Sequence, residues 1–333
     1  MKRSSLAVLL SGILLLCLLT GCGAKTLQQD RTVFAMDTVM SLRVYAPEKD
    51  GTLDALEALL IELDRELSAT DPESKLSGLN SSGAASDRAL ADLVRRSADL
   101  SRRTGGALDL SLLPASRLWG FPSKLYQVPD PEALEALRSR IGMDKISVTE
   151  EEILLTDGAQ LDLGAVAKGW AADRCREILE ENGVSGILAL GGNIQTVGKK
   201  PDGTDWKIGI QDPEDPSRNR LVLTLAGTHA VVTSGDYQRA FTENGVTYCH
   251  ILDPQTLSPV QNSLRSVTVV ADEGLLADGL STALFVMGRE AGVAFWRSST
   301  DFEAVWIEAD GAVTVTEGLS GAVDDGDVTV VKR

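Results

Sequence analysis

Residues 161–170 read LDLGAVAKGW, and this stretch joins the end of a strand to the beginning of a helix. The strand is expected to carry Asp162 to its end, and the small residues after it predict a helix over residues 165–181, closed by Asn182-Gly183. Unpaired backbone amides in the first turn of such a helix attract an anion, and Lys168 adds a positive charge there. An N-capping aspartate beside a solvated lysine would give the same pattern.

The elements around this stretch do not alternate strictly between helix and strand. Apolar residues at helical spacing predict helices over residues 53–67, 86–103, 131–140, 273–286 and 289–296, and residues 105–129 are expected to be loop. Alternating or β-branched runs predict strands over residues 33–45 with a break at 35–38, around Ile153 and Leu161, over 186–190, 206–210, 220–225, 229–233, 246–252 and 266–271, and small antiparallel strands from 302 to 332. Helices that flank strands in blocks favour an α+β fold, with a largely antiparallel sheet core in a single catalytic domain over residues 31–333.

The first 30 residues are predicted to lie outside the fold. A basic start precedes an apolar run over residues 6–19, and about 14 residues are too few to cross the ~30 Å core of a bilayer comfortably. The letters LTGC then end at Cys22 and match a lipobox. Residues 1–21 are therefore interpreted as a lipoprotein signal peptide and 22–30 as a tether, with Cys22 as the lipidation site of an extracytoplasmic protein anchored to the bacterial cell membrane. An uncleaved anchor helix is the alternative.

The composition is that of a globular protein with a strong acidic balance. Of the 333 residues, 43% are hydrophobic and 24% are charged, and 48 acidic against 32 basic side chains give a formal charge of −16. This charge disfavours a nucleic-acid partner. Metal-dependent nucleotide chemistry stays open, because a divalent cation can sit between an acidic protein and an anionic ligand.

Histidine and cysteine are too few for a transition-metal site. The chain has only His229 and His250, and Cys175 and Cys249 are the only cysteines in the predicted folded body. Any metal is therefore expected to be a hard ion with oxygen ligands. The two cysteines are expected to be free thiols, although an oxidising compartment would allow them to pair.

Three further clusters combine glycine, carboxylate and hydroxyl groups. Gly191-Gly192-Asn193 breaks a strand and lets the backbone approach a ligand, although a plain hairpin has the same pattern. The segment TSGDY at 233–237 is expected to neighbour His250, which titrates in the range of a general base. Asp278 and Thr282 are four apart on a predicted helix with apolar surroundings, so they share one face, and a carboxylate with a hydroxyl suits a hard cation.

Three common enzyme motifs do not occur. The chain lacks the G-x-S-x-G elbow of serine hydrolases, the Walker loop and the G-x-G-x-x-G dinucleotide fingerprint.

Taken in order, the motifs resemble the ApbE family, the FAD:protein FMN transferases. The resemblance covers roughly residues 31–290, and its motifs are AMDT at 35–38, GALD at 106–109, LWGF at 118–121, DLGAVAKG at 162–169, GGN at 191–193, TSGDY at 233–237, HILDP at 250–254 and ADGLST at 277–282. It implies transfer of FMN from FAD to a Thr or Ser hydroxyl of a partner redox protein, with release of AMP.

The resemblance also implies roles for individual residues. FAD would be bound by Met36, Ala107, Leu108, Asp109, Asp162, Lys168 and Ile251. Mg2+ would be held by the backbone carbonyl of Ala165 and by the side chains of Asp278 and Thr282, with Ser281 as a fourth position. His250 would take the proton of the acceptor hydroxyl.

The chain departs from the family pattern at three positions. Thr70 replaces a common tyrosine, Asp37 a common glycine and Cys249 a common histidine. Two other functions stay open: an FAD pyrophosphatase that gives FMN and AMP, and a lipoprotein that binds FAD without catalysis.

Overall fold

The computed structural model describes residues 26–324 and 327–333. The predicted signal peptide and Cys22 lie outside the described residues. The strand β1 begins at Thr26, so the described part of the predicted tether belongs to the sheet.

A nine-stranded sheet forms the centre of the molecule. In spatial order its strands are β1 (Thr26–Ala35), β2 (Thr38–Pro47), β6 (Ser185–Leu190), β7 (Asn193–Val197), β10 (His229–Gly235), β15 (Leu264–Ala271), β16 (Phe302–Glu308), β17 (Val313–Thr316) and β18 (Thr329–Val331). All neighbours pair antiparallel except β17 and β18, which are parallel. The predicted α+β class with a largely antiparallel sheet is confirmed.

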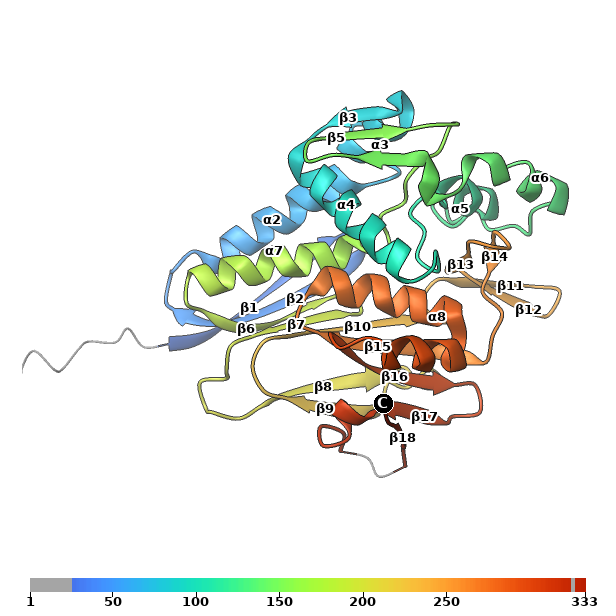
Figure 1. Ribbon diagram of the computed structural model, residues 1–333. Coiled ribbons are helices and arrows are strands. Elements are labelled where there is room, and N and C mark those ends of the chain that lie inside the picture. Colours follow the sequence, from blue (N-terminus) through green and yellow to red (C-terminus); the bar gives the residue numbers. More distant parts are fainter. Residues whose placement is uncertain (1–25, 325–326) are drawn as a thin grey trace, which may run out of the picture.

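Helices cover one face of the sheet and a hairpin covers the other (Figure 1). The helices are α2 (Thr52–Leu67), α3 (Lys75–Ser82), α4 (Arg88–Arg103), α5 (Leu113–Trp119), α6 (Pro131–Glu135), α7 (Ala167–Glu181) and α8 (Gly274–Arg297), with 3-10 turns at Arg138–Arg140, Met143–Lys145 and Glu317–Leu319. The hairpin consists of β8 (Trp206–Gln211) and β9 (Asn219–Leu225). Three smaller sheets complete the fold: β3 (Ala84–Ser86) with β5 (Glu152–Leu155) and β4 (Ile146–Val148), β11 (Ala240–Glu243) with β12 (Val246–Cys249), and β13 (Leu252–Asp253) with β14 (Ser258–Pro259).

The alternation of the strands explains the two layers. Leu42, Leu188 and Val269 face the helices in one buried cluster, whereas Val231 and Val270 face the β8–β9 hairpin in another. Successive side chains of a strand point to opposite faces, so a run such as β15 that is apolar at most positions is buried on both sides.

Several sequence predictions needed correction. Leu161 is not in a strand, because its amide and carbonyl bond to the Asn80 side chain instead of to a neighbouring strand. The predicted loop after residue 105 contains α5, whose first turn holds Pro114. The final strand β18 pairs parallel rather than antiparallel. The segment after Gly192 forms β7, which pairs antiparallel with β6. The glycines therefore lie in the turn of a hairpin, which was the alternative interpretation of this motif.

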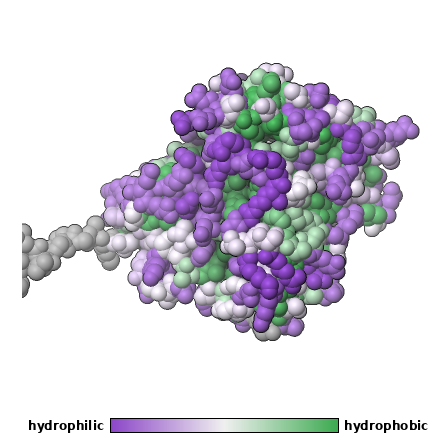
Figure 2. All heavy atoms as spheres, in the orientation of Figure 1, coloured by the Kyte–Doolittle hydropathy of each residue, from purple (hydrophilic) through white to green (hydrophobic). Residues whose placement is uncertain are grey.

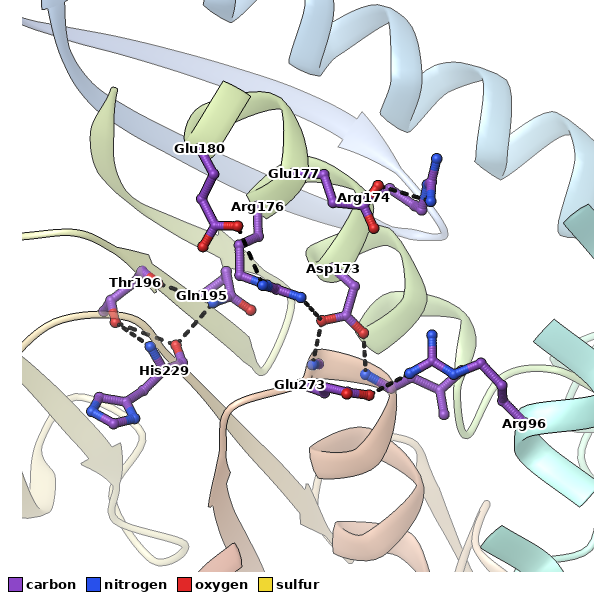
Figure 3. Close-up of polar contacts among 12 residues, drawn as sticks. Arg96, Asp173, Arg174, Arg176, Glu177, Glu180, Gln195, Thr196, His229 and Glu273 are labelled. Carbon is purple, nitrogen blue, oxygen red and sulfur yellow. Dashed lines mark hydrogen bonds and ion pairs between the residues drawn. The ribbon is translucent and has the colours of Figure 1, made fainter. Parts of the chain in front are cut away.

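Hydrogen bonds connect a residue in the middle of α7 to the first turn of α8. Asp173 of α7 is 3% exposed, and its carboxylate accepts hydrogen bonds from the amides of Gly274 (2.7 Å) and Leu275 (2.9 Å) (Figure 3). The residue before α8, Glu273, makes no side-chain cap of its own. A neighbouring helix therefore supplies the acceptors that the first turn of α8 requires, and this fixes the position of the residues that follow.

The surface is mixed. Figure 2 shows hydrophilic residues over most of one face, with hydrophobic residues between them. Among the helices of the described residues, none has the length and apolar character needed to cross a bilayer.

Candidate active site

A carboxylate and three hydroxyl groups meet where α8 crosses β10. Asp278 is 4% exposed, and its Oδ2 accepts a hydrogen bond from the amide of Gly169 in the first turn of α7 (2.7 Å). Ser234 of β10 places its hydroxyl 2.8 Å from that of Ser281 and 3.3 Å from that of Thr282. The predicted pairing of Asp278 with Thr282 on one helix face therefore lies next to the TSGDY strand.

The hydroxyl groups are not equivalent. Ser281 is fully buried and donates to the carbonyl of Asp278 (2.8 Å), so Ser234 is left to donate to Ser281. Thr282 is half-buried, and its hydroxyl contacts that of Ser234 at the longer distance of 3.3 Å. Thr282 is therefore the hydroxyl of this set that is most available to a ligand.

Burial governs the charge of Asp278. Desolvation raises the pKa of this carboxyl above its usual value, and the Lys168 ammonium, the Gly169 amide and the Asn193 side chain lower it in part. The Nδ2 atom of Asn193 has no partner within normal hydrogen-bond distance, so its influence on Asp278 is electrostatic. A buried carboxylate with so few partners would gain from a cation.

His250 belongs to the same neighbourhood. Burial, followed by the positive charges of Arg239 and Lys168, lowers the pKa of His250 to about 4, and its Nδ1 is buried without a hydrogen-bond partner. The ring of Phe121 lies 6.5 Å from the imidazole, edge to face. The imidazole is therefore neutral at pH 7 and has a nitrogen free to accept a proton.

The glycine turn and the β1–β2 turn lie side by side. A Cβ atom added to Gly191 would collide with the side chain of Thr38, and one added to Gly192 would come within 3.6 Å of the carbonyl of Thr233. Both glycines also have positive φ angles, of 66° and 93°. The strand breaks at Gly191-Gly192 therefore pack directly against the turn at 36–37 and against the beginning of the TSGDY segment.

Ion pairs connect the β1–β2 turn to the chain that carries His250. The Asp37 carboxylate contacts Lys124 at 3.0 Å and Arg239 at 3.1 Å. Arg239 in turn accepts the backbone hydrogen bond of His250 through its carbonyl (2.9 Å). Met36, the predicted FAD contact in this turn, is half-buried and donates its amide to Asp64 (2.9 Å).

The other predicted FAD residues lie along the same end of α7 and α8. Leu108 is buried against Gly279 of α8, so a ligand would meet its backbone rather than its side chain. The Asp109 carboxylate accepts from Ser111, and burial raises the pKa of Asp109. Asp162 is half-buried and accepts from the Gly164 amide at 2.8 Å. Ile251 is buried in the core cluster directly after His250.

Ala165 lies in the turn before α7, half-buried against the core. Its backbone carbonyl is the predicted metal ligand. The residues that the structure describes contain no group of three or more His, Cys, Asp and Glu side chains that could hold a metal. The predicted donor set is different: one buried carboxylate, hydroxyls and a carbonyl, which are the oxygen groups that suit a hard ion.

Three residues of the site had no assigned role from the sequence. Ser234 and Asn193 lie in segments that the sequence singled out, but only the crossing of β10 and α8 shows what they contact. Arg239 carries no sequence signal, because an arginine between strands is typical of a solvated loop. Cys175 and Cys249 are both free and buried, as expected, and burial raises their pKa values to about 12 and about 11.

The fold and the site define an α+β protein with an oxygen-ligand cluster, a neutral buried histidine and a lysine at a helix N-terminus. A family model described as the ApbE family matches residues 36–306. The chain belongs to the ApbE family.

Relatives with this family's activity in their names match most of the chain. A protein of Treponema pallidum named FAD:protein FMN transferase is 31% identical, with 92% of each chain covered. One of the same name from Vibrio cholerae is 33% identical, over 84% of this chain and 87% of its own length.

Solved structures agree with these matches. The crystal structure of the ApbE protein of Thermotoga maritima has a TM-score of 0.82 and 28% identity, and covers 88% of this chain and 98% of its own. The apo flavinyl transferase ApbE of Pseudomonas stutzeri has a TM-score of 0.80 and 31% identity, with 90% and 98% covered.

Proposed function

We propose that this chain is an FAD:protein FMN transferase that depends on Mg2+ and acts on a Thr or Ser hydroxyl of a partner redox protein. The observation that carries the proposal is the buried Asp278, on the same face of α8 as Thr282, with Lys168 close enough to lower the pKa of both Asp278 and His250. The names of the relatives support the coarser part of the proposal, the transfer of FMN from FAD to a protein.

The reaction moves a phosphoryl-linked group between two oxygen atoms. The acceptor oxygen forms a bond to the phosphorus of the FMN half, the bond from that phosphorus to the bridging oxygen breaks, and AMP leaves with the bonding electrons. The acceptor hydroxyl loses one proton, and His250, neutral and with Nδ1 unpartnered, is the residue placed to take it.

The cation and the positive side chains would together neutralise the negative charge of the diphosphate. Asp278, Thr282 and the carbonyl of Ala165 would hold Mg2+, with Ser281 behind them, and the ion would supply neutralisation of the phosphate charge. Lys168 adds its ammonium at the N-terminus of α7, where the backbone amides also favour an anion. Met36, residues 107–109, Asp162 and Ile251 would position the rest of FAD.

Mass spectrometry tests the proposal directly. The purified protein is incubated with FAD, Mg2+ and an exported redox subunit, and the expected result is an FMN-sized mass increase on one Thr or Ser together with AMP. Incubation without the acceptor is expected to leave FAD intact. Rapid release of FMN and AMP without the acceptor would show a pyrophosphatase, and bound FAD with no AMP under either condition would show a binding protein.

The state of His250 predicts the pH dependence of transfer. Because the pKa of His250 is lowered to about 4, the imidazole is already neutral at pH 6, and kcat/KM should be nearly constant from pH 6 to 8 and fall toward pH 4. The anionic FAD favours the imidazolium, so the acid limb of kcat should lie at a higher pH. His250→Gln should lower the rate by about 10²- to 10⁴-fold at neutral pH.

His229→Gln is the control for that variant. His229 contacts the carbonyl of Ala226 (3.0 Å) and lies outside the site, so its variant should keep the profile. A His250→Gln variant that keeps the wild-type rate at neutral pH would exclude His250 as the base.

We also propose that the protein is attached to the outer face of the cell membrane through lipid on Cys22. The lipobox supports this location, and it would place the enzyme where exported redox subunits fold. Fractionation of Cys22→Ala tests it, because a variant that still sediments with membranes would contradict a lipid anchor.

A further inference from the structure

A cavity of about 340 Å3 is lined by residues that follow the hydroxyl cluster closely in the chain. Its lining includes Asp236, Thr247, Cys249, Gln261 and Phe285. Asp236 follows Ser234 by two residues, just after β10 ends, and Phe285 follows Thr282 by three, so this wall of the cavity lies about one turn of α8 beyond Thr282. None of the residues assigned above to FAD or Mg2+ lines it.

The chemistry of the lining does not suit a nucleotide. The lining residues include the Asp236 carboxylate, the Gln261 and Asn262 amides and the Thr247 hydroxyl, and none of them is Lys or Arg. Asp236 already pairs with Arg265 at 3.0 Å, and burial nevertheless raises the pKa of this carboxyl. An anionic ligand would find no Lys or Arg among the lining residues, whereas amide and hydroxyl groups can bind peptide backbone.

One wall of the cavity is the outer edge of β12. The hydrogen bond from the His250 amide to the Arg239 carbonyl continues the β11–β12 ladder by one pair, and bonded pairs alternate with non-bonded pairs in an antiparallel ladder. The next pair, Ala240 with Cys249, and the pair Thr242 with Thr247 are therefore non-bonded. Their amides and carbonyls point away from the partner strand.

The outward groups of Thr247 and Cys249 face the cavity. The carbonyl of Thr247 accepts only a side-chain hydrogen bond, from Gln261 at 3.3 Å, which agrees with that direction. Further along the chain the same side is paired, because the Val260 amide donates to the Ile251 carbonyl (2.9 Å) and β13 pairs with β14. No further backbone pair of the described residues continues this pairing, and the side-chain amide of Asn262 donates to the Phe285 carbonyl (2.7 Å). The cavity lies along the part of the β12 edge that has no partner among the described strands.

We propose that this cavity binds the acceptor: an extended, hydroxyl-bearing segment of the partner protein adds as a strand to the Thr247–Cys249 edge of β12. The proposal rests on the transferase function proposed above and assigns the acceptor a place in it. Addition of a strand to an exposed edge binds the backbone of a peptide without requiring a particular sequence. A volume near the lower end of ligand pockets favours a short segment with small side chains.

A pair of proline variants tests the edge. Thr247→Pro removes an amide that points into the cavity, whereas Thr242→Pro removes the equivalent amide on the opposite edge of the same hairpin. The two threonines face each other with Oγ1 atoms 3.2 Å apart, so both variants lose the same side-chain hydrogen bond. Proline is tolerated on strand edges where the amide is not paired.

The expected result is a difference between the two variants that concerns the acceptor alone. With the redox subunit that shows the FMN mass increase as the probe, Thr247→Pro should raise the KM for the acceptor by about tenfold or more, and Thr242→Pro should leave it near the wild-type value. The Kd for FAD should be the same in both variants and the wild type.

Hydrogen exchange provides a second measurement that does not depend on a variant. The Thr247 amide should exchange freely in the FAD-bound protein and become protected when the redox subunit is added, while the His250 amide stays protected throughout. Equal KM values in the two variants, or no added protection at Thr247, would overturn the proposal. A wild-type protein that forms no FMN–acceptor bond would instead contradict the function itself.

Discussion

Asp278→Asn is expected to abolish FMN transfer while leaving the free protein as stable as the wild type or more stable. The carboxylate is the only charged side chain assigned to the cation, so its loss should lower the transfer rate by at least about a hundredfold. Asparagine keeps an oxygen that can accept the hydrogen bond of the Gly169 amide. It also removes the cost of burying a carboxylate that is 4% exposed.

The pH dependence of this stability follows from the raised pKa of Asp278. Between the usual value of 3.8 and the higher value in the folded protein, the folded state binds more protons than the unfolded state. Stability therefore falls as the pH rises through the folded pKa, and the asparagine variant is free of that loss. The Tm of Asp278→Asn should exceed that of the wild type at pH 7, and the difference should shrink toward pH 4.

Asp301→Asn is the opposite control. Two hydrogen bonds from Arg103, both 2.6 Å, lower the pKa of Asp301, and this carboxylate has no assigned role in the site. Its variant should lose a little stability at pH 7 and keep full transfer activity. The assignment of Asp278 to the cation would be wrong if Asp278→Asn retained Mg2+-dependent transfer near the wild-type rate.

The sequence predicted most helices and strands because their hydrophobic spacing is regular. The helix α4 shows this well: it spans Arg88–Arg103 where a helix over residues 86–103 was predicted, and Asp87 caps it through the Leu90 amide at 2.9 Å. The wrong predictions occurred where contacts between residues far apart in sequence, and not the local hydrophobic pattern, determine the backbone structure. Leu161 has the pattern of a strand residue, but the side chain of Asn80, far away in sequence, binds both of its backbone groups.

The sequence predicted which segments form the site, but not which side chains in them contact one another. Helical spacing alone put Asp278 and Thr282 on one face, and the structure brings them to Ser234 as that spacing allowed. No local pattern could show that Asp173 caps α8, because a buried carboxylate inside a helix is indistinguishable in sequence from an exposed one. The sequence also could not show which backbone groups of β12 point outward, because that depends on the register of the β11–β12 hairpin.

Gly169→Ala should cause the largest loss of stability of the single changes considered. Its added Cβ would lie 2.6 Å from the Cβ of Asp278 and closer still to the carbonyl of Gly274, which is backbone and cannot rotate away. The crossing of α7 over α8 depends on this contact, and forcing a methyl group into a packed contact costs about 1–3 kcal/mol or more. Because Gly169 also donates its amide to Asp278, the helix separation should displace the carboxylate and reduce transfer as well.

Gly78→Ala separates this steric effect from the general effect of an added methyl group. Gly78 lies in α3 with no atom within 4 Å of the added Cβ and without a positive φ angle, so alanine should stabilise the protein by about 0.4–1 kcal/mol. Urea unfolding of both variants, with transfer measured at a temperature where each is folded, tests the prediction. Equal stability of Gly169→Ala and the wild type would mean that α7 and α8 do not approach as closely as this site requires, and the placement of Asp278 would fail with it.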